Sequence, residues 1–346
     1  MKTVLMFSPG DLDAISLYRH WGPMLELEKQ GIVRLVAMSH DSKQINNWQY
    51  YKKCDFAFIS RPATNHDFFF IKECEKNGLP LWVDMDDNLF LIPDDLDAFD
   101  HFGSEQAQTY TLFALKVASK ITVATKALQT FLKEQFGLES EIIPNALDDR
   151  WVVMKKPFIK GDKVIWRGSK SQLANLLYFE NEIRTIIEER PKLQFNFMGL
   201  NPWFITRRIK RSDQTGVTWT KGQTPIDFMI SLLDGGGTFN FVVLLRSIFN
   251  ETRSNNAWIE STVAGMVTLA PDWGEWKRPG IFNYSSKSDF VSKFIDLVNT
   301  PELKLKQHHD ESWAYIRKNL LLSIVNEQRI SIITKMGGLH AKGKGT

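Results

Sequence analysis

The sequence predicts an α/β protein with two successive domains, each built on a parallel sheet. At 346 residues the chain exceeds the usual size of one hydrophobic core. Short apolar runs alternate with segments of helical apolar spacing, which is typical of βαβ units with right-handed crossovers. The alternation restarts at Lys163, after a basic segment over 155–163. The predicted parts are an N-terminal domain over 1–150, a linker over 151–162, a C-terminal domain over 163–319, and a C-terminal helix over 320–346 that packs back toward the N-terminal domain and ends in a flexible tail.

Composition narrows the class of protein. With 43% hydrophobic and 24% charged residues, the chain has the composition of a soluble globular protein. The formal net charge of +3 permits an acidic partner but does not indicate one. Cys54 and Cys74 form no CxxC pair or Cys/His cluster, so neither a disulfide framework nor a zinc site is predicted. No signal peptide or membrane-spanning run is expected, and we predict a cytoplasmic protein without an integral membrane segment.

The first half begins with an expected strand over 2–7, a loop over 8–13, a helix over 14–30 and a strand over 32–38. Ligands of parallel sheets bind beyond the carboxyl ends of the strands, so the loop containing Gly10 should line a cleft. This loop lacks GxGxxG, which argues against a nicotinamide cofactor. Arg19 lies early in the first helix, where it serves either the cleft or the surface.

Three carboxylates follow the fourth expected strand. After strands over 55–60 and 79–83, separated by a helix over 68–77, the chain reaches Asp84, Asp86 and Asp87. They form either a turn and capping cluster or a ligand site. Asp84 and Asp86 could hold Mg²⁺ or Mn²⁺ as a DxD pair, but the phosphate-binding features lie far along the chain, so we favour a role without metal. Residues 89–100 contain Pro93 and four acids and should form a loop or lid. A helix over 104–118, a strand over 121–124, a helix over 126–136 and a strand over 141–145 complete this half.

The second half opens with a strand over 163–166 and the turn Arg167-Gly168-Ser169-Lys170-Ser171, followed by a helix over 173–189. Gly168 permits close approach to the backbone, and two cations with two hydroxyls at a strand-to-helix turn suit a diphosphate. Further strands are expected over 193–198, 216–220, 239–245 and 266–270. The remaining helices are expected over 224–233, 287–299, 303–319 and 320–336.

The segment 249–271 is the strongest local candidate for a nucleotide site. We expect a helix from Ser254 to Ala264, capped by Ser254 or Asn255 and stopped by Gly265. Free amides and Arg253 at its start suit phosphates, while Glu260 on the same face suits ribose hydroxyls. The alternative is an ordinary capped helix with a solvated polar face.

Several segments in this order resemble glycosyltransferases of the GT-B fold, most closely the family 4-like group (group 1), and a phage-type member of that group is one alternative. Val83-Asp84-Met85-Asp86-Asp87 resembles a "DxDD" motif, and Tyr18-Arg19 with Gly22-Pro23-Met24 resembles the family's first helix. The other matching segments are Ile143-Pro144-Asn145-Ala146-Leu147-Asp148, similar to "PNGVD", Ile165-Trp166-Arg167-Gly168-Ser169, and Arg253-Ser254-Asn255 with Ile259-Glu260-Ser261 and Gly265. Thr252 stands where many members carry a glutamate, and Glu251 is one register off.

The resemblance implies two Rossmann-like domains facing across a cleft and transfer of a sugar from a UDP- or GDP-sugar to a hydroxyl acceptor, with no cofactor and no required metal. It assigns the donor to Arg167, Gly168, Lys170, Arg253, Ser254, Asn255 and Glu260, and the acceptor side to Gly10, Arg19 and Asp84. Asp86 or Asp87 would be the catalytic base of an inverting reaction. In a retaining reaction, which family 4 implies, the donor phosphate takes the proton.

The acceptor stays open between a saccharide, a lipid-linked glycan and modified DNA. One alternative is a DNA-modifying transferase of phage type that acts on hydroxymethylated bases in the host cytoplasm; another is a nucleotide-sugar or carbohydrate-binding protein without turnover. The basic run over 207–211 is either a phosphate-contacting patch or a solvated helix face.

Overall fold

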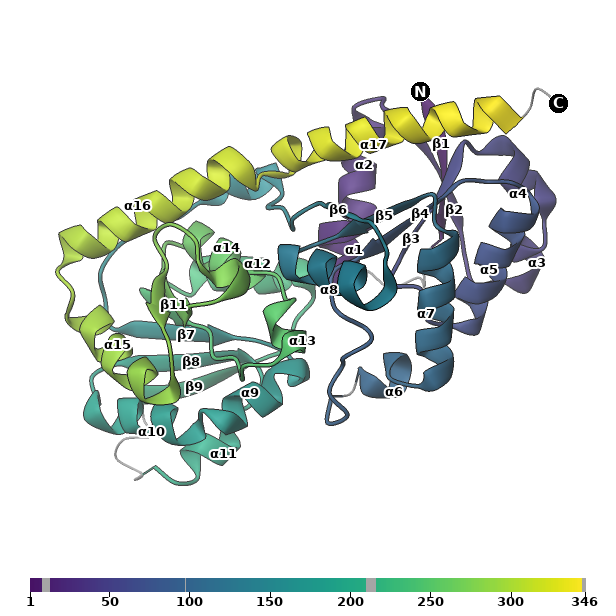
Figure 1. Cartoon of the computed structure of the whole chain (residues 1–346). Helices are drawn as coiled ribbons and strands as arrows, with labels where there is room; N and C mark the ends of the chain where they lie inside the picture. Colours follow the sequence, from purple (N-terminus) through teal and green to yellow (C-terminus); the bar gives the residue numbers. More distant parts are fainter. Residues whose placement is uncertain (8–12, 97, 210–215, 344–346) are drawn as a thin grey trace. The chain divides into compact units, whose positions relative to one another are not determined.

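The computed structural model of the chain describes all residues except 8–12, 97, 210–215 and 344–346, and it contains two parallel sheets (Figure 1). The predicted α/β class with two parallel-sheet domains is therefore confirmed. The chain forms two compact units. Unit 1 comprises Met1–Ala146, Thr252–Ser254 and Leu322–Thr346, and unit 2 comprises Leu147–Glu251 and Asn255–Leu321.

The sheet of unit 1 has the strand order β2-β1-β3-β4-β5-β6, and every pairing is parallel. Its strands are β1 (Lys2–Phe7), β2 (Val33–Met38), β3 (Phe56–Ser60), β4 (Leu81–Met85), β5 (Lys120–Val123) and β6 (Glu141–Ile142). The order reverses between β1 and β3. In doubly wound sheets, ligands bind outside the carboxyl ends of the strands at such a reversal. The carboxyl ends of β1, β3 and β4 therefore mark the edge of this sheet where a ligand is expected.

The helices of unit 1 are α1 (Ala14–Arg19), α2 (Trp21–Lys29), α3 (Ser42–Ile45), α4 (Trp48–Lys53), α5 (Asn65–Lys76), α6 (Phe99–Phe102), α7 (Glu105–Val117), α8 (Lys126–Phe136) and α17 (Leu322–Gly343). The single helix expected over 14–30 is two helices. The break falls at His20, whose backbone is not helical (φ −105°, ψ −89°) and whose ring hydrogen-bonds to Ser60 on β3. The expected loop over 89–100 ends at the short helix α6, which begins at Phe99.

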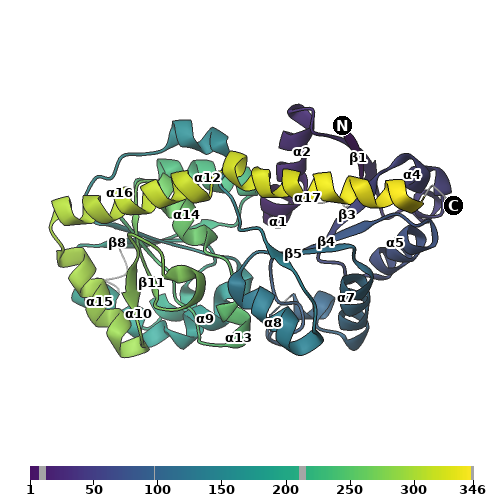
Figure 2. The same ribbon diagram turned by 45° about the horizontal axis from the view of Figure 1, so that its top comes forward.

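The C-terminal helix α17 packs into unit 1, against α2 and β3 (Figure 2). Leu322, Val325 and Ile333 of α17 lie in one apolar core with residues of β1, β3 and β4. The amide of Asn326 donates a hydrogen bond to the carbonyl of Pro23 at 3.4 Å. Residues that are distant in sequence therefore complete the same core.

The sheet of unit 2 has the order β12-β11-β10-β7-β8-β9, again entirely parallel. Its strands are β7 (Lys163–Arg167), β8 (Gln194–Gly199), β9 (Val217–Lys221), β10 (Phe239–Phe241), β11 (Val267–Pro271) and β12 (Phe282–Tyr284). The order reverses between β7 and β10, as in the Rossmann arrangement, so the loops after these two strands flank the expected ligand crevice.

Helices cover both faces of this sheet. They are α9 (Leu173–Tyr178), α10 (Glu180–Glu189), α11 (Trp203–Thr206), α12 (Pro225–Asp234), α13 (Ile248–Glu251), α14 (Asn256–Val263), α15 (Lys287–Asn299) and α16 (Glu302–Asn319), with short 3-10 turns η1 (Asp149–Met154), η2 (Lys170–Gln172) and η4 (Gly274–Trp276). Alternate residues of β7 enter opposite cores: Val164 and Trp166 pack with α10 and α15, and Ile165 packs with α12 and α14. The helix expected over 173–189 is interrupted at Phe179. Among the described helices, none combines the length and the apolar character needed to cross a bilayer.

Candidate active site

A buried ion pair lies at the carboxyl edge of the sheet of unit 1. The Arg19 guanidinium donates to both carboxylate oxygens of Asp84, at 2.9 and 2.5 Å, and its side chain has no exposed surface. Thr122 donates a third hydrogen bond to Asp84 at 2.5 Å and accepts one from the Trp82 indole at 2.8 Å. Both oxygens of Asp84 are thus committed to protein donors. Asp84 is a structural anchor, which argues against the DxD metal interpretation, and Arg19 is not a surface arginine.

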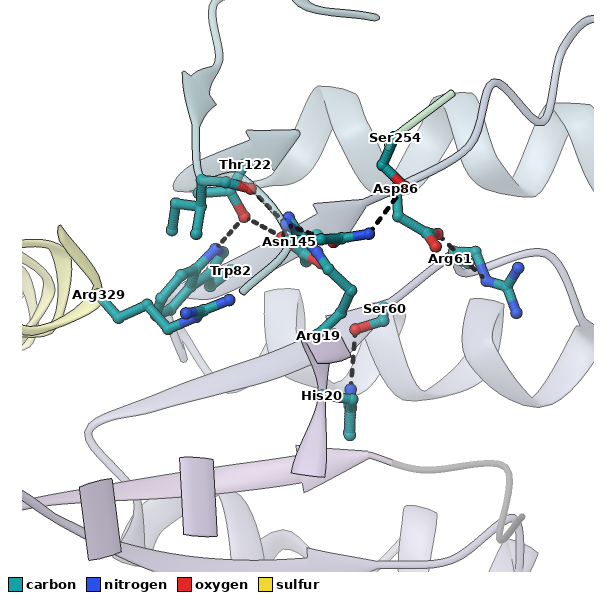
Figure 3. A network of polar contacts seen from close by, with 12 residues as sticks. Arg19, His20, Ser60, Arg61, Trp82, Asp86, Thr122, Asn145, Ser254 and Arg329 are labelled. Atoms are coloured by element: carbon teal, nitrogen blue, oxygen red, sulfur yellow. Dashed lines mark hydrogen bonds and ion pairs between the residues drawn. The ribbon is translucent and has the colours of Figure 1, made fainter. Parts of the chain in front are cut away.

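The same guanidinium reaches the end of the first half of the chain. Arg19 donates to the carbonyl of Ile143 and, at 3.2 Å, to the side-chain oxygen of Asn145. The Asn145 amide in turn donates to the hydroxyl of Ser254 at 2.9 Å (Figure 3). Thr125 donates to the carbonyl of Thr252 at 2.8 Å. These bonds explain why residues 252–254 belong to unit 1.

Asp86 lies two residues after Asp84 and directly follows the end of β4. Its carboxylate is buried, with 8% of the residue exposed, and its Oδ1 has no hydrogen-bond partner among the described residues. The nearest cation is Arg61, whose Nε lies 3.7 Å from Oδ1 (Figure 3). Burial raises the pKa of Asp86 to about 6, while Arg61 opposes this rise. A carboxylate of this kind is ionised at neutral pH and more basic than an exposed one, as a general base requires.

Two further ionisable side chains are buried beside the network. His20 hydrogen-bonds through Nδ1 to the Ser60 hydroxyl at 2.9 Å, and its Nε2 has no partner among the described residues. Burial lowers the pKa of His20 to about 4, so its ring is neutral at pH 7. Arg329 of α17 is also buried, and burial together with the charge of Arg19 lowers its pKa.

In unit 2, two glycines bring the ends of β7 and β8 together. The amide of Gly168 donates to the carbonyl of Met198 at 3.0 Å. Gly199 has φ +100°, and a Cβ there would lie 2.2 Å from the carbonyl oxygen of Gly168. A Cβ on Gly168 would itself lie 2.6 Å from the Trp166 ring. Only glycine fits at both positions, and the turn carrying Lys170 is thereby held at the sheet reversal.

Arg167 and Glu260, two residues predicted to bind the donor, form an ion pair although they are far apart in sequence. Glu260 is 2% exposed. The Arg167 guanidinium also lies 5.4 Å from the centre of the Phe228 ring. Ser261 and Thr262 are buried as well. The alternative of an α14 with a solvated polar face is therefore wrong, because its polar side chains are inside the protein.

The start of α14 differs from the prediction. The helix begins at Asn256, not Ser254, and Asn255 is its N-cap residue without a side-chain capping bond. The Asn255 amide donates to the carbonyl of Glu275 at 2.9 Å instead. Arg253 and Ser254 precede the helix and lie in the segment Thr252–Ser254, which belongs to unit 1. The buried Thr252 is paired through its backbone.

Of the other predicted residues, Gly10 lies outside the described residues, and Asp87 is half-buried next to Asp86. In the basic run, Arg207 lies 4.7 Å from the exposed Trp203 ring, and Arg208 forms an ion pair with Glu180 at 3.1 Å. The remaining two basic residues of this run, 210 and 211, are not described.

Two doubly wound parallel sheets in one chain are the architecture of the GT-B fold, which is found in glycosyltransferases. Solved structures with this fold match nearly the whole chain. Sucrose-phosphate synthase of Thermosynechococcus elongatus has a TM-score of 0.67 and 8% identity, covering 97% of this chain and 99% of its own. A glycosyltransferase of Rickettsia africae has a TM-score of 0.66 and 12% identity, covering 97% and 98%.

S. aureus TarM, solved with UDP, has a TM-score of 0.58 and 11% identity over 81% of this chain. Only 56% of TarM is covered, so this chain spans little more than half its length. The UDP-GlcNAc 2-epimerase of Neisseria meningitidis, with a TM-score of 0.53 and 12% identity over 97% of this chain and all of its own, is another match. At these identities the likeness shows the fold alone. No family model and no curated protein matches the sequence.

Sequence reasoning missed Arg61, Thr122 and the partners of Asn145. The signal for Arg61 was present, because it directly follows β3 and the carboxyl ends of parallel strands carry the ligand residues. Thr122 had no comparable signal, because its role depends on the pairing of β4 with β5.

Proposed function

We propose that this protein is a glycosyltransferase that moves a sugar from a UDP- or GDP-linked donor to a hydroxyl acceptor. The observation that carries the proposal is the glycine-lined turn at Gly168, beside the buried pair of Arg167 and Glu260, at the reversal of a Rossmann-ordered sheet. The full-length likeness to glycosyltransferases supports it. Membership of the family 4-like group stays a prediction.

In this proposal unit 2 binds the nucleotide diphosphate. The turn amides and the charges of Arg167 and Lys170 stabilise the departing diphosphate, a role that needs no metal. Glu260, held by Arg167, accepts hydrogen bonds from the ribose hydroxyls. The resemblance also assigns Arg253 and Ser254, which belong to unit 1, to the donor, and that assignment stays a prediction. Turnover that persists in EDTA is expected; loss of turnover in EDTA with recovery on adding Mn²⁺ would contradict the metal-free mechanism.

Unit 1 presents the acceptor. Asp86 is our candidate for the base that receives the proton of the acceptor hydroxyl, because it is buried, lacks a hydrogen bond at Oδ1 and lies next to a cation. Asp87 is the alternative base. The acceptor class, whether saccharide, lipid-linked glycan or hydroxymethylated DNA, is left to the acceptor screen.

The first experiment incubates the full chain with a panel of UDP-, GDP- and ADP-sugars and measures release of the nucleoside diphosphate. We expect slow hydrolysis of one donor, which becomes faster when an acceptor is added. Binding without release would indicate a non-catalytic binding protein. A sugar that is epimerised while still attached to UDP would indicate an epimerase.

A pair of variants tests the donor site. Glu260→Gln removes a charged acceptor from the ribose and should weaken donor binding by about ten- to a hundredfold. Glu188→Gln, at an exposed position of α10, is the matched control and should leave affinity unchanged. Calorimetry with UDP measures both. Equal affinities for UDP in the two variants, with the fold intact by circular dichroism, would refute the role of Glu260.

A further inference from the structure

Arg61 occupies an unusual backbone position at the carboxyl end of β3. Among the described residues it is the one non-glycine residue with positive φ (48°). Its amide donates to the carbonyl of Asp84 at 3.0 Å, next to the anchor described above. Side chains other than glycine are strained in this region, and such strain is retained where the surroundings hold the residue in place, often at functional sites.

This backbone conformation accompanies a guanidinium set between two carboxylates. Its Nε lies 3.7 Å from Asp86 Oδ1 and its Nη2 lies 3.6 Å from Asp13 Oδ2. The guanidinium also lies 5.2 Å from the centre of the Phe102 ring. The Arg61 side chain is 18% exposed, so water screens its charge only in part. Arg61 follows β3 and Asp86 follows β4, which are neighbouring strands, and Asp13 is the N-cap residue of α1.

The separation from Asp86 matters for the chemistry. At 3.7 Å the Nε and Oδ1 atoms attract each other electrostatically but are too far apart for a hydrogen bond. The charge of Arg61 therefore favours the ionised form of Asp86 without a hydrogen bond to its Oδ1. That oxygen has no donor among the described residues.

We propose that Arg61 is a positioning residue of the transfer reaction, which keeps Asp86 ionised so that its carboxylate can receive the proton of the acceptor hydroxyl. This inference rests on the proposed function. In the step it serves, the acceptor O–H proton passes to the Asp86 carboxylate while the acceptor oxygen bonds to the anomeric carbon. The bond from that carbon to the donor phosphate oxygen breaks, and the nucleoside diphosphate leaves with the electron pair.

The charges facing Asp86 determine the expected pH dependence. Arg61 and Arg19 lower its pKa, whereas burial, Asp87 and Asp84 raise it, giving a pKa of about 6. Since the base must be ionised, kcat/KM should fall as the pH drops below about 6. Removing Arg61 leaves burial and the two carboxylates opposed by Arg19 alone, so the pKa should rise.

The test compares pH profiles of kcat/KM for the full chain and its variants. Arg61→Gly suits the positive φ and removes the guanidinium, and Arg61→Lys keeps a positive charge. The acid limb should move up by about one pH unit or more in Arg61→Gly and by less in Arg61→Lys. Arg34→Met, at an exposed position of β2, is the control and should keep the parental profile.

A second measurement does not depend on turnover. The carboxyl carbon of Asp86, followed by NMR, should titrate at higher pH in Arg61→Gly than in the parent chain, while affinity for UDP is unchanged. An unchanged titration of Asp86 would overturn the inference. If the parent chain neither binds nor turns over any nucleotide sugar, the proposed function fails, whatever the Asp86 titration shows. If donor turnover is normal and only the acid limb fails to move, the inference on Arg61 alone fails.

Discussion

Replacing Asp86 with asparagine should make the protein more stable at neutral pH while removing activity. The carboxylate is buried, and burial raises its pKa from 3.8 to about 6. The folded state thus binds this proton more tightly than the unfolded state does. The resulting stabilisation is fully present below about pH 4 and is lost as the pH rises through 6. A shift of about two pKa units corresponds to about 3 kcal/mol.

Asparagine has no charge to bury, so Asp86→Asn should avoid this loss. At about pH 8 the variant should be more stable than the parent chain by up to about 3 kcal/mol, and the difference should shrink toward pH 4. Hydrogen exchange of the β3 and β4 amides measures the stability of unit 1 directly. Asp95→Asn, at an exposed position, is the control. A variant that is less stable at pH 8, or a difference that is independent of pH, would refute the reasoning.

Two other substitutions test the anchors of each unit. Gly199→Ala should destabilise unit 2 by more than Gly236→Ala and should also lower the affinity for UDP. Both glycines have positive φ, but only at Gly199 does the new Cβ meet a backbone oxygen. Equal effects of the two substitutions on denaturation and on calorimetric UDP affinity would contradict this. Arg19→Met leaves Asp84 buried without its counter-ion. It should lower the free energy of unfolding, measured with denaturant, by about 3–5 kcal/mol. Adding Asp84→Asn should recover part of that loss, and no recovery would argue against the ion pair as the cause.

The strand-and-loop pattern was sufficient to predict where the polar side chains gather. Asp84, Asp86 and Arg167 each lie at or directly after a predicted strand, so the parallel topology determined their location. The pairing of Arg167 with Glu260 did not follow from spacing, because it depends on how β7 and α14 pack around the same core. The sequence predicts Arg167 and Glu260 separately as residues that bind the donor.

The failures have physical causes that involve distant residues. Ser254 and Asn255 both suit an N-cap, but Asn145 hydrogen-bonds the Ser254 hydroxyl, so Asn255 is the N-cap residue and the helix starts two residues after Ser254. The helix expected over 14–30 breaks at His20, whose ring bonds to β3. For Arg19 the sequence left the cleft and the surface open, and its hydrogen bonds to Asp84 and Asn145 exclude the surface. Local propensity predicted the elements, whereas tertiary hydrogen bonds determined their ends.

The assignment of residues 252–254 to unit 1 has a consequence for protein engineering. Exchanging unit 1 between proteins of this fold by a single junction near Ala146 would separate Thr125 and Asn145 from the backbone and hydroxyl groups they bind at Thr252 and Ser254. It would also separate β1 and β3 from α17, which belongs to the same core. A chimera should therefore take the three segments of unit 1, residues 1–146, 252–254 and 322–346, from the same parent protein. Each of these hydrogen bonds and apolar contacts then keeps both of its partners.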